Sequence, residues 1–279
     1  PTYVMGVFKL PFSVCDDLSK LIRDFWWGAE NGKRKTHWLS WDKMIRSKGQ
    51  GGMGFRDMRI FNKALLARQA WRLLQTPHSL CAGVLKARYY PQGNLLDTVF
   101  TGQPSSTWSA ISYGLELLKE GMIWRIGNGE SVRIWRDNWI PRSSSLKPFS
   151  ARGWSRLIRV SSLLDERGTW DVAAVWANFL PIDARAILSI RTSPRREPDF
   201  LAWQPEKNGI FSVKSAYKLG LSLTEHARNV PATSTRPNGD REIWKKLWSL
   251  PVPPKVRTFA WRAITNSLAT EENKKKHHI

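Results

Sequence analysis

The residues best suited to chemistry lie near the end of the chain, in the basic and aromatic stretch PPKVRTFAWRA, residues 253–263. Cationic side chains neutralise phosphates, and an indole ring offers a face on which a base can stack. This stretch and the lysines that follow it are therefore typical of a nucleic-acid contact. Its candidate contact residues are Lys255, Arg257, Trp261, Arg262, Lys274, Lys275 and Lys276.

Helix geometry leaves a plainer alternative open for the same stretch. Pro253 and Pro254 suit a helix start, and Arg257 and Trp261 are one turn apart, as a cation–π contact requires. An apolar stripe is expected to face the core: Val256, Phe259, Ala260, Ala263 and Ile264. On geometry alone, we favour the interpretation that Trp261 borders the core while the charges are solvated.

A second basic cluster lies near the start of the chain, where Lys33, Arg34 and Lys35 follow the turn sequence Asn31-Gly32. The whole chain carries 44 Lys and Arg against 23 Asp and Glu, a net charge of +21. The excess is densest at the two ends, as expected for surfaces that face a polyanion. The alternative is a basic protein whose charges are solvated and serve no dedicated partner.

Three other groups resemble ligand or catalytic sites but have plainer explanations. Asp16 and Asp17 open an amphipathic segment, where acidic residues cap a helix and favour its dipole. The glycine-rich loop at 48–55 lacks the Lys-Ser or Lys-Thr of a phosphate-binding loop and is expected to be a flexible turn. His277 and His278 have no nearby cysteine and are expected to be exposed tail residues. The sequence therefore contains no complete catalytic or metal site.

Composition points to a folded, intracellular protein. Each of the sixteen tryptophans carries a large apolar surface that must be buried. The two cysteines, Cys15 and Cys81, cannot build a disulfide framework and fit a reducing compartment. No run approaches the roughly eighteen apolar residues of a membrane span, and the first residues do not form a convincing signal peptide. We expect a nuclear or cytoplasmic protein with no membrane partner.

The elements that must position these residues are mostly helical. Helices are expected at 16–27, 60–75 and 212–223, and in two pieces within 171–191 that are separated at Pro181. The periodicity therefore indicates a helix-rich chain.

Two short β-hairpins are expected between these helices. One lies within 122–139, around Asn128-Gly129, and the other within 199–213, around Asn208-Gly209. Residues 224–240 are expected to be a polar linker. The predicted fold class is α+β, helix-rich with two small β-hairpins.

Several motifs occur in a fixed order along the chain. They are FWWG, HWLSWDKM, KGQGGMGFRDMRIFNKALLARQAWRLL, LKARYYP, WRIGNGESVRIWRDNW, GIFSVKSAY and WKKLWSLPVPPKVRTFAWRAITNSLAT. The series, from about residue 10 onward, resembles the region downstream of the polymerase core in plant LINE-type (non-LTR) retrotransposon reverse transcriptases. Its last two motifs resemble the start of the family's reverse-transcriptase zinc-binding domain.

The resemblance implies an RNA-directed DNA polymerase that copies its own RNA into DNA at a nicked chromosomal target. The family's catalytic aspartates and divalent metals belong to a palm that is expected upstream of Pro1, and its zinc ligands are expected after Ile279. No catalytic residue, zinc ligand or cofactor is therefore carried over to this chain. We expect no complete polymerase fold and no activity of the chain alone. Leu268-Ala269-Thr270 departs slightly from the family's usual Leu-Pro-Thr.

The resemblance also suggests a division of the chain and a function. Residues 1–90 would form a basic, thumb-like or connector-like region, 91–210 a mixed connector with the hairpins, and 211–279 the first part of a zinc-binding domain. The expected function is RNA or DNA binding, mostly through phosphates, with the missing polymerase core as a further partner. Two alternatives stay open: a structural connector or protein-interaction module without nucleic-acid contact, and a subunit that works with a palm supplied in trans.

Overall fold

The chain forms two compact units in the computed structural model, unit 1 from Pro1–Lys63 and Leu221–Ile279, and unit 2 from Ala64–Gly220. For residues 29–30, 33–34, 225–227 and 276 the structure describes the backbone alone. The division predicted from the sequence, into residues 1–90, 91–210 and 211–279, has different boundaries and stays a prediction. The residues that the structure describes are 2–30, 33–34, 36–98, 100, 102–142, 145–153, 155–193, 195–227 and 242–276.

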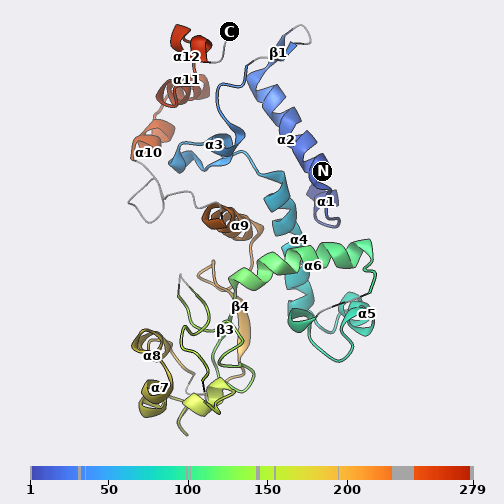
Figure 1. Cartoon of the computed structure of the whole chain (residues 1–279), viewed down its shortest axis with the longest axis vertical. Helices are drawn as coiled ribbons and strands as arrows, with labels where there is room; N and C mark the ends of the chain where they lie inside the picture. Colours follow the sequence, from blue (N-terminus) through green and yellow to red (C-terminus); the bar gives the residue numbers. More distant parts are fainter. Residues whose placement is uncertain are drawn as a thin grey trace. The chain divides into compact units, whose positions relative to one another are not determined.

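Unit 1 is mainly helical (Figure 1). Its strands β1 (Ala29–Glu30) and β2 (Lys33–Arg34) pair antiparallel, with Ala29 opposite Arg34. Two helices extend across the unit boundaries, α4 (Met58–Gln75) and α9 (Val213–Ala227). The remaining helices of unit 1 are α1 (Thr2–Met5), α2 (Phe12–Trp27), α3 (Trp41–Ile45), the 3₁₀ helix η1 (Lys48–Gln50), α10 (Glu242–Ser249), α11 (Pro254–Ile264) and α12 (Glu271–Lys276).

The core of unit 1 is built from two distant parts of the sequence and is rich in tryptophan. Its buried members come from residues 27–44 and 244–261, and further tryptophans lie partly buried around them. Neither part encloses this apolar surface by itself, so the two parts depend on each other for burial. The buried members are Trp27, Leu39, Met44, Trp244, Leu247 and Trp261.

Unit 2 has one core where α4, α6 and α9 meet. A second core is formed by side chains within residues 126–190. Its only sheet among the described residues joins β3 (Met122–Arg125) to β4 (Phe200–Trp203). Its other elements are α5 (Leu80–Tyr89), η2 (Leu95–Asp97), α6 (Ser106–Gly121), η3 (Val160–Leu163), α7 (Val172–Asn178) and α8 (Pro181–Leu188).

The fold class is confirmed as helix-rich α+β, and the described residues form no complete polymerase fold. The helices expected at 60–75, within 171–191 and at 212–223 are present as α4, α7 with α8, and α9. Of the expected linker, residues 224–227 continue α9, and 228–240 lie outside the described residues.

The helix expected to start at Asp16 begins earlier, at Phe12, with Pro11 as the preceding residue. The prediction that Asp16 caps the helix is therefore wrong. Its carboxylate instead accepts two hydrogen bonds from the Arg59 guanidinium, at 2.7 and 2.6 Å. The side chain thus joins α2 to α4 through an exposed ion pair rather than satisfying a helix end.

The two expected hairpins are wrong in their pairing. Strand β3 does not pair with the residues after Asn128-Gly129; it pairs antiparallel with β4, Met122 opposite Trp203. The turn near Gly209 forms, with the Trp203 amide donating to the Gly209 carbonyl at 2.7 Å, but β4 has no strand partner on that side among the described residues.

A buried carboxylate explains the first failure. Asp199 lies directly before β4 and accepts hydrogen bonds from the amides of Gly127, Gly129 and Ser131 at 2.7, 2.9 and 2.8 Å. A Cβ at Gly127 would collide with the carbonyl oxygen of Glu197. The chain after β3 therefore wraps around a carboxylate some seventy residues away instead of folding back as a strand.

A buried ion pair anchors α8 to Arg142 and to the neighbouring Ser150, which lie before η3 in the sequence. Asp183 is fully buried; it contacts Arg142 Nη1 at 2.6 Å and accepts bonds from the Ser150 amide and hydroxyl at 2.6 and 2.5 Å. Burial by itself raises the pKa of Asp183, but the hydrogen bonds from Ser150, the Phe149 amide and Arg142 outweigh it. The pKa consequently lies below the ordinary value of 3.8.

This ion pair should make unit 2 sensitive to acid. Since the pKa of Asp183 is lower in the folded state, its stabilisation is complete above the unfolded-state pKa and is lost as pH falls through the folded-state value. The difference in unfolding free energy between the wild type and Asp183→Asn, which does not titrate, should narrow from about pH 6 to about pH 2.5 in urea titrations. A difference that stays constant over this range would contradict the assignment.

Candidate nucleic-acid interface

The glycine-rich loop is a packed part of unit 1 rather than a flexible turn. It holds η1 and closes with the Gly54 amide donating to the Arg46 carbonyl at 2.9 Å. At Gly51, φ is +87° and an added Cβ would lie 2.8 Å from the Trp244 ring. Only glycine permits this approach, so α10 rests on the loop backbone.

Trp261 packs against the same loop and is fully buried, with an exposed fraction of 0%. Its indole Nε1 donates to the Gly51 carbonyl at 2.9 Å. A buried indole finds an acceptor here that a phenyl ring cannot use, which fixes this side of α11 inward. The interpretation favoured on helix geometry, that Trp261 borders the core, is therefore confirmed. The alternative role as a stacking surface fails here, because neither ring face is available to a base.

The apolar stripe of α11 faces outward, contrary to the expectation from the sequence. Phe259 is 61% exposed, and Val256, Ala263 and Ile264 are exposed as well. The opposite side carries Trp261 as its one large apolar residue, so the periodicity of the apolar residues selected the wrong side. Phe259 is the aromatic residue that sequence reasoning missed, and it lies one turn after Lys255.

The cations of α11 differ in availability. Lys255 is exposed, whereas Arg257 is half-buried and donates to the Trp248 carbonyl at 3.1 Å instead of forming the expected contact with Trp261. Arg262 is half-buried, with its guanidinium 5.5 Å from the centroid of the Trp27 ring. Lys255 is therefore the α11 cation best placed for an external phosphate.

The lysines of α12 are held beside α11 by a polar turn. The buried Asn273 amide donates to the carbonyls of Asn266 and Leu268 at 3.0 and 2.9 Å. Lys274 lies 3.5 Å from Glu271 and Lys275 is exposed. Of Lys276 only the backbone is described, within α12.

The N-terminal cluster lies in the β1–β2 hairpin, where Lys33 and Arg34 form β2 and Lys35 lies outside the described residues. The hairpin starts two residues after Trp27, the residue that Arg262 covers. Figure 1 shows the hairpin and α12 at the same end of unit 1. Unit 1 thus contains both predicted basic clusters, although the side chains of Lys33 and Arg34 are not described.

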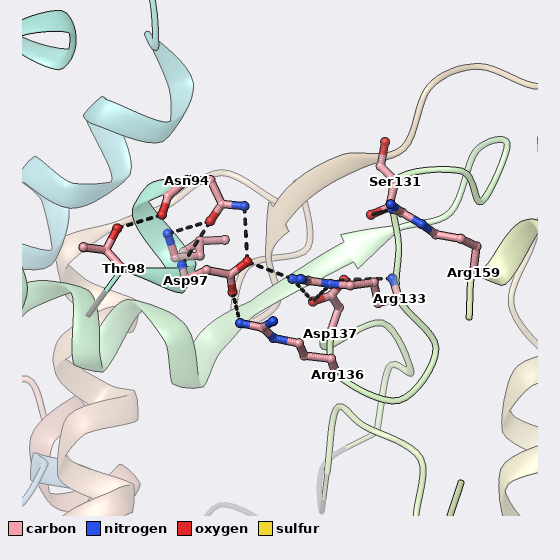
Figure 2. A network of polar contacts seen from close by, with 9 residues as sticks. Asn94, Asp97, Thr98, Ser131, Arg133, Arg136, Asp137 and Arg159 are labelled. Carbon is pink, nitrogen blue, oxygen red and sulfur yellow. Dashed lines mark hydrogen bonds and ion pairs between the residues drawn. The ribbon is translucent and has the colours of Figure 1, made fainter. Parts of the chain in front are cut away.

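Unit 2 contains a separate network of arginines, most of which are neutralised (Figure 2). Asp97 contacts Arg133 at 3.1 Å and Arg136 at 2.6 Å, and Arg133 also contacts Asp137 at 2.9 Å. Bonds to Asp137 and Asp97 raise the pKa of Arg133 although burial opposes them. In the same view Arg159 donates only to the Ser131 carbonyl, at 3.1 Å, and keeps its charge uncompensated by the residues drawn.

The described residues do not fit a zinc site, since no group of three or more His, Cys, Asp or Glu side chains among them could hold a metal. His277 and His278 lie outside this part of the chain. In the same described part, no helix has the length and apolar character needed to cross a membrane.

Comparison with known proteins gives a consistent set of relatives. The family described as zinc-binding in reverse transcriptase matches residues 211–279. An Arabidopsis thaliana protein named as a ribonuclease H protein is 32% identical over 290 residues, which cover 100% of this chain and 44% of that protein. An uncharacterized mitochondrial protein of Arabidopsis thaliana is 38% identical over 151 residues, which cover 54% of this chain and 98% of that protein. No solved structure matches the chain.

Proposed function

This chain belongs to the family of proteins related to retrotransposon reverse transcriptases, and we propose that its unit 1 binds RNA or DNA within a LINE-type enzyme. The bound group is the phosphate backbone, with stacking of a base as a secondary contact. Polymerase chemistry and its divalent metals belong, in this proposal, to a core that the chain itself does not supply.

The exposed face of α11 supports this function most directly. Lys255 and Phe259 lie one turn apart on it, which pairs a phosphate-binding cation with an uncovered aromatic ring. Lys255 and Lys275 have no carboxylate partner among the described residues. Their charges are therefore available to an external anion.

The charge of unit 1 as a whole favours the same ligand. Its two chain segments contain 23 Lys and Arg against 11 Asp and Glu. An excess of this size attracts a polyanion over distances of about 10 Å at moderate salt. Release of condensed cations should then make binding depend strongly on salt concentration.

A salt titration tests the proposal. For single-stranded RNA, each lost phosphate contact should reduce the slope of log affinity against log salt by about 0.7. The variant Lys255→Gln with Lys275→Gln should therefore have a slope about 1.4 smaller than the wild type in fluorescence anisotropy. Lys119→Gln with Lys207→Gln removes two exposed charges from unit 2 and serves as the matched control. Equal slopes for both double variants and the wild type would overturn the proposal.

A second candidate, a protein-interaction module, is favoured by α2. Leu21 is 65% exposed and Phe25 is 90% exposed, and the two lie one turn apart on the same face. Apolar helix faces of this kind mark contacts with other proteins. The partner in this case is the polymerase core. Retained binding of that core, together with no binding of nucleic acid, would favour the second candidate over the first.

A further inference from the structure

A cationic segment of unit 2 is free of acidic residues. Between residues 142 and 159 the sequence has five cations and no Asp or Glu. An uninterrupted series of one sign is unusual for a surface that only needs solubility, where both signs are normally interspersed. The five cations are Arg142, Lys147, Arg152, Arg156 and Arg159.

Only the first of these cations is used internally as an ion-pair partner. Arg142 is paired with the buried Asp183 and also stacks on Phe149 at 4.2 Å. The other four are exposed, and none has a carboxylate partner in the part of the chain that the structure describes. Arg159 and Arg152 donate only to backbone carbonyls, those of Ser131 and Ser155.

The backbone that carries Arg156 and Arg159 is held rigidly against the second core of unit 2. The Leu157 carbonyl accepts from the Trp135 indole at 2.9 Å, and the Ile158 carbonyl accepts from the Ile134 amide at 3.0 Å. Leu157 packs against the core, so in this extended stretch its neighbour Arg156 is turned to solvent. Part of the ordering of this backbone is therefore supplied by the fold before a ligand binds.

Carboxylates lie close to this segment, but they form ion pairs with neighbouring arginines and not with the arginines of the segment itself. Arg133 and Arg136 have Asp97 and Asp137 as partners, whereas Arg159, which forms a β-bridge with Arg133, has neither (Figure 2). Two adjacent arginines directly opposite each other repel unless one is neutralised. The uncompensated charge thus lies on the outer member of the pair.

We propose that residues 147–153 and 155–159 form a second nucleic-acid contact, in unit 2, which binds the phosphates of a single strand. Three of its four cations are arginines, whose planar guanidinium binds phosphate oxygens bidentately. Their spacing along the sequence, at positions 147, 152, 156 and 159, suits a chain of phosphates better than one small anion, which needs converging donors. This inference shares the nucleic-acid ligand with the proposed function but uses none of the unit 1 residues.

Fluorescence anisotropy with single-stranded RNA, at several salt concentrations, tests this contact on the full chain. The variant Arg152→Gln, Arg156→Gln and Arg159→Gln should reduce the salt slope by about 2, since each phosphate contact contributes about 0.7. Arg156→Gln alone, which removes no described contact, should reduce the slope by about 0.7 and covers the case in which the triple variant folds poorly. The charge-matched control Arg167→Gln, Arg185→Gln and Arg195→Gln removes three exposed arginines elsewhere in unit 2 and should leave the slope unchanged.

The outcomes separate this inference from the proposed function. If the unit 1 lysine variant reduces the slope and the arginine variants do not, the unit 2 contact is overturned while the proposed function stands. If only the arginine variants reduce it, the unit 2 contact stands and the unit 1 assignment fails. A loss of polyglutamate binding without any change in RNA binding would show an acidic protein partner and overturn the nucleic-acid contact.

Discussion

Trp261→Ala should lower the unfolding free energy of unit 1 by about 3–5 kcal/mol, whereas Phe259→Ala should change it by less than about 1 kcal/mol. The first variant empties a fully buried site and leaves the Gly51 carbonyl without its indole donor. The second truncates a ring that is 61% exposed on the same helix. Hydrogen exchange of the α10 and α11 amides, with urea titration followed by circular dichroism, measures both effects.

In nucleic-acid binding the order of the two variants should be the opposite, with the larger effect in Phe259→Ala. Phe259→Ala should weaken binding of single-stranded RNA by about 1–3 kcal/mol, the usual value for a lost base–aromatic stack. Its salt slope should stay unchanged, because no phosphate contact is removed. A large loss of stability in Phe259→Ala together with a small one in Trp261→Ala would show that the outward stripe of α11 packs inward after all.

Asp199→Ala should cost unit 2 about 3 kcal/mol or more, because three amides lose a common acceptor and each buried unsatisfied donor costs about 1–3 kcal/mol. Asp199→Asn should cost less. Its remaining oxygen can still accept from Gly127 and Gly129, while its NH₂ group faces the Ser131 donor. Thermal unfolding and exchange protection of these three amides measure the series.

Asp165 provides a matched control for Asp199. It also accepts from two backbone amides, those of Arg167 and Thr169, but within a short exposed turn. Asp165→Ala should therefore have a smaller effect than Asp199→Ala, because water replaces the lost acceptor. Similar losses for the two variants would contradict the role given to Asp199 in closing the loop after β3.

Local signals predicted these helices well because the residues that start or stop a helix are its neighbours in the sequence. Helix α4 ends at Gln75, two residues before Pro77, and α8 and α11 begin at Pro181 and Pro254, where the missing amide hydrogen costs nothing. The hairpins failed for the opposite reason. Asn128-Gly129 is a strong turn signal, but the acceptor for the Gly129 amide is Asp199, 70 residues away.

The candidate interface shows the same division between local and long-range information. The positive charge, the ordered motifs that place the chain in its family, and the helical state of residues 254–264 are all readable from neighbouring residues. The orientation of that helix is not, because the apolar stripe predicts one side to pack whereas Trp261, on the other side, is the residue that is buried. The choice is made by the Gly51 carbonyl, 210 residues from Trp261, which accepts an indole hydrogen bond that Phe259 cannot make. Folding therefore buries Trp261, one of the candidate contact residues, and leaves Phe259 beside Lys255 on the surface.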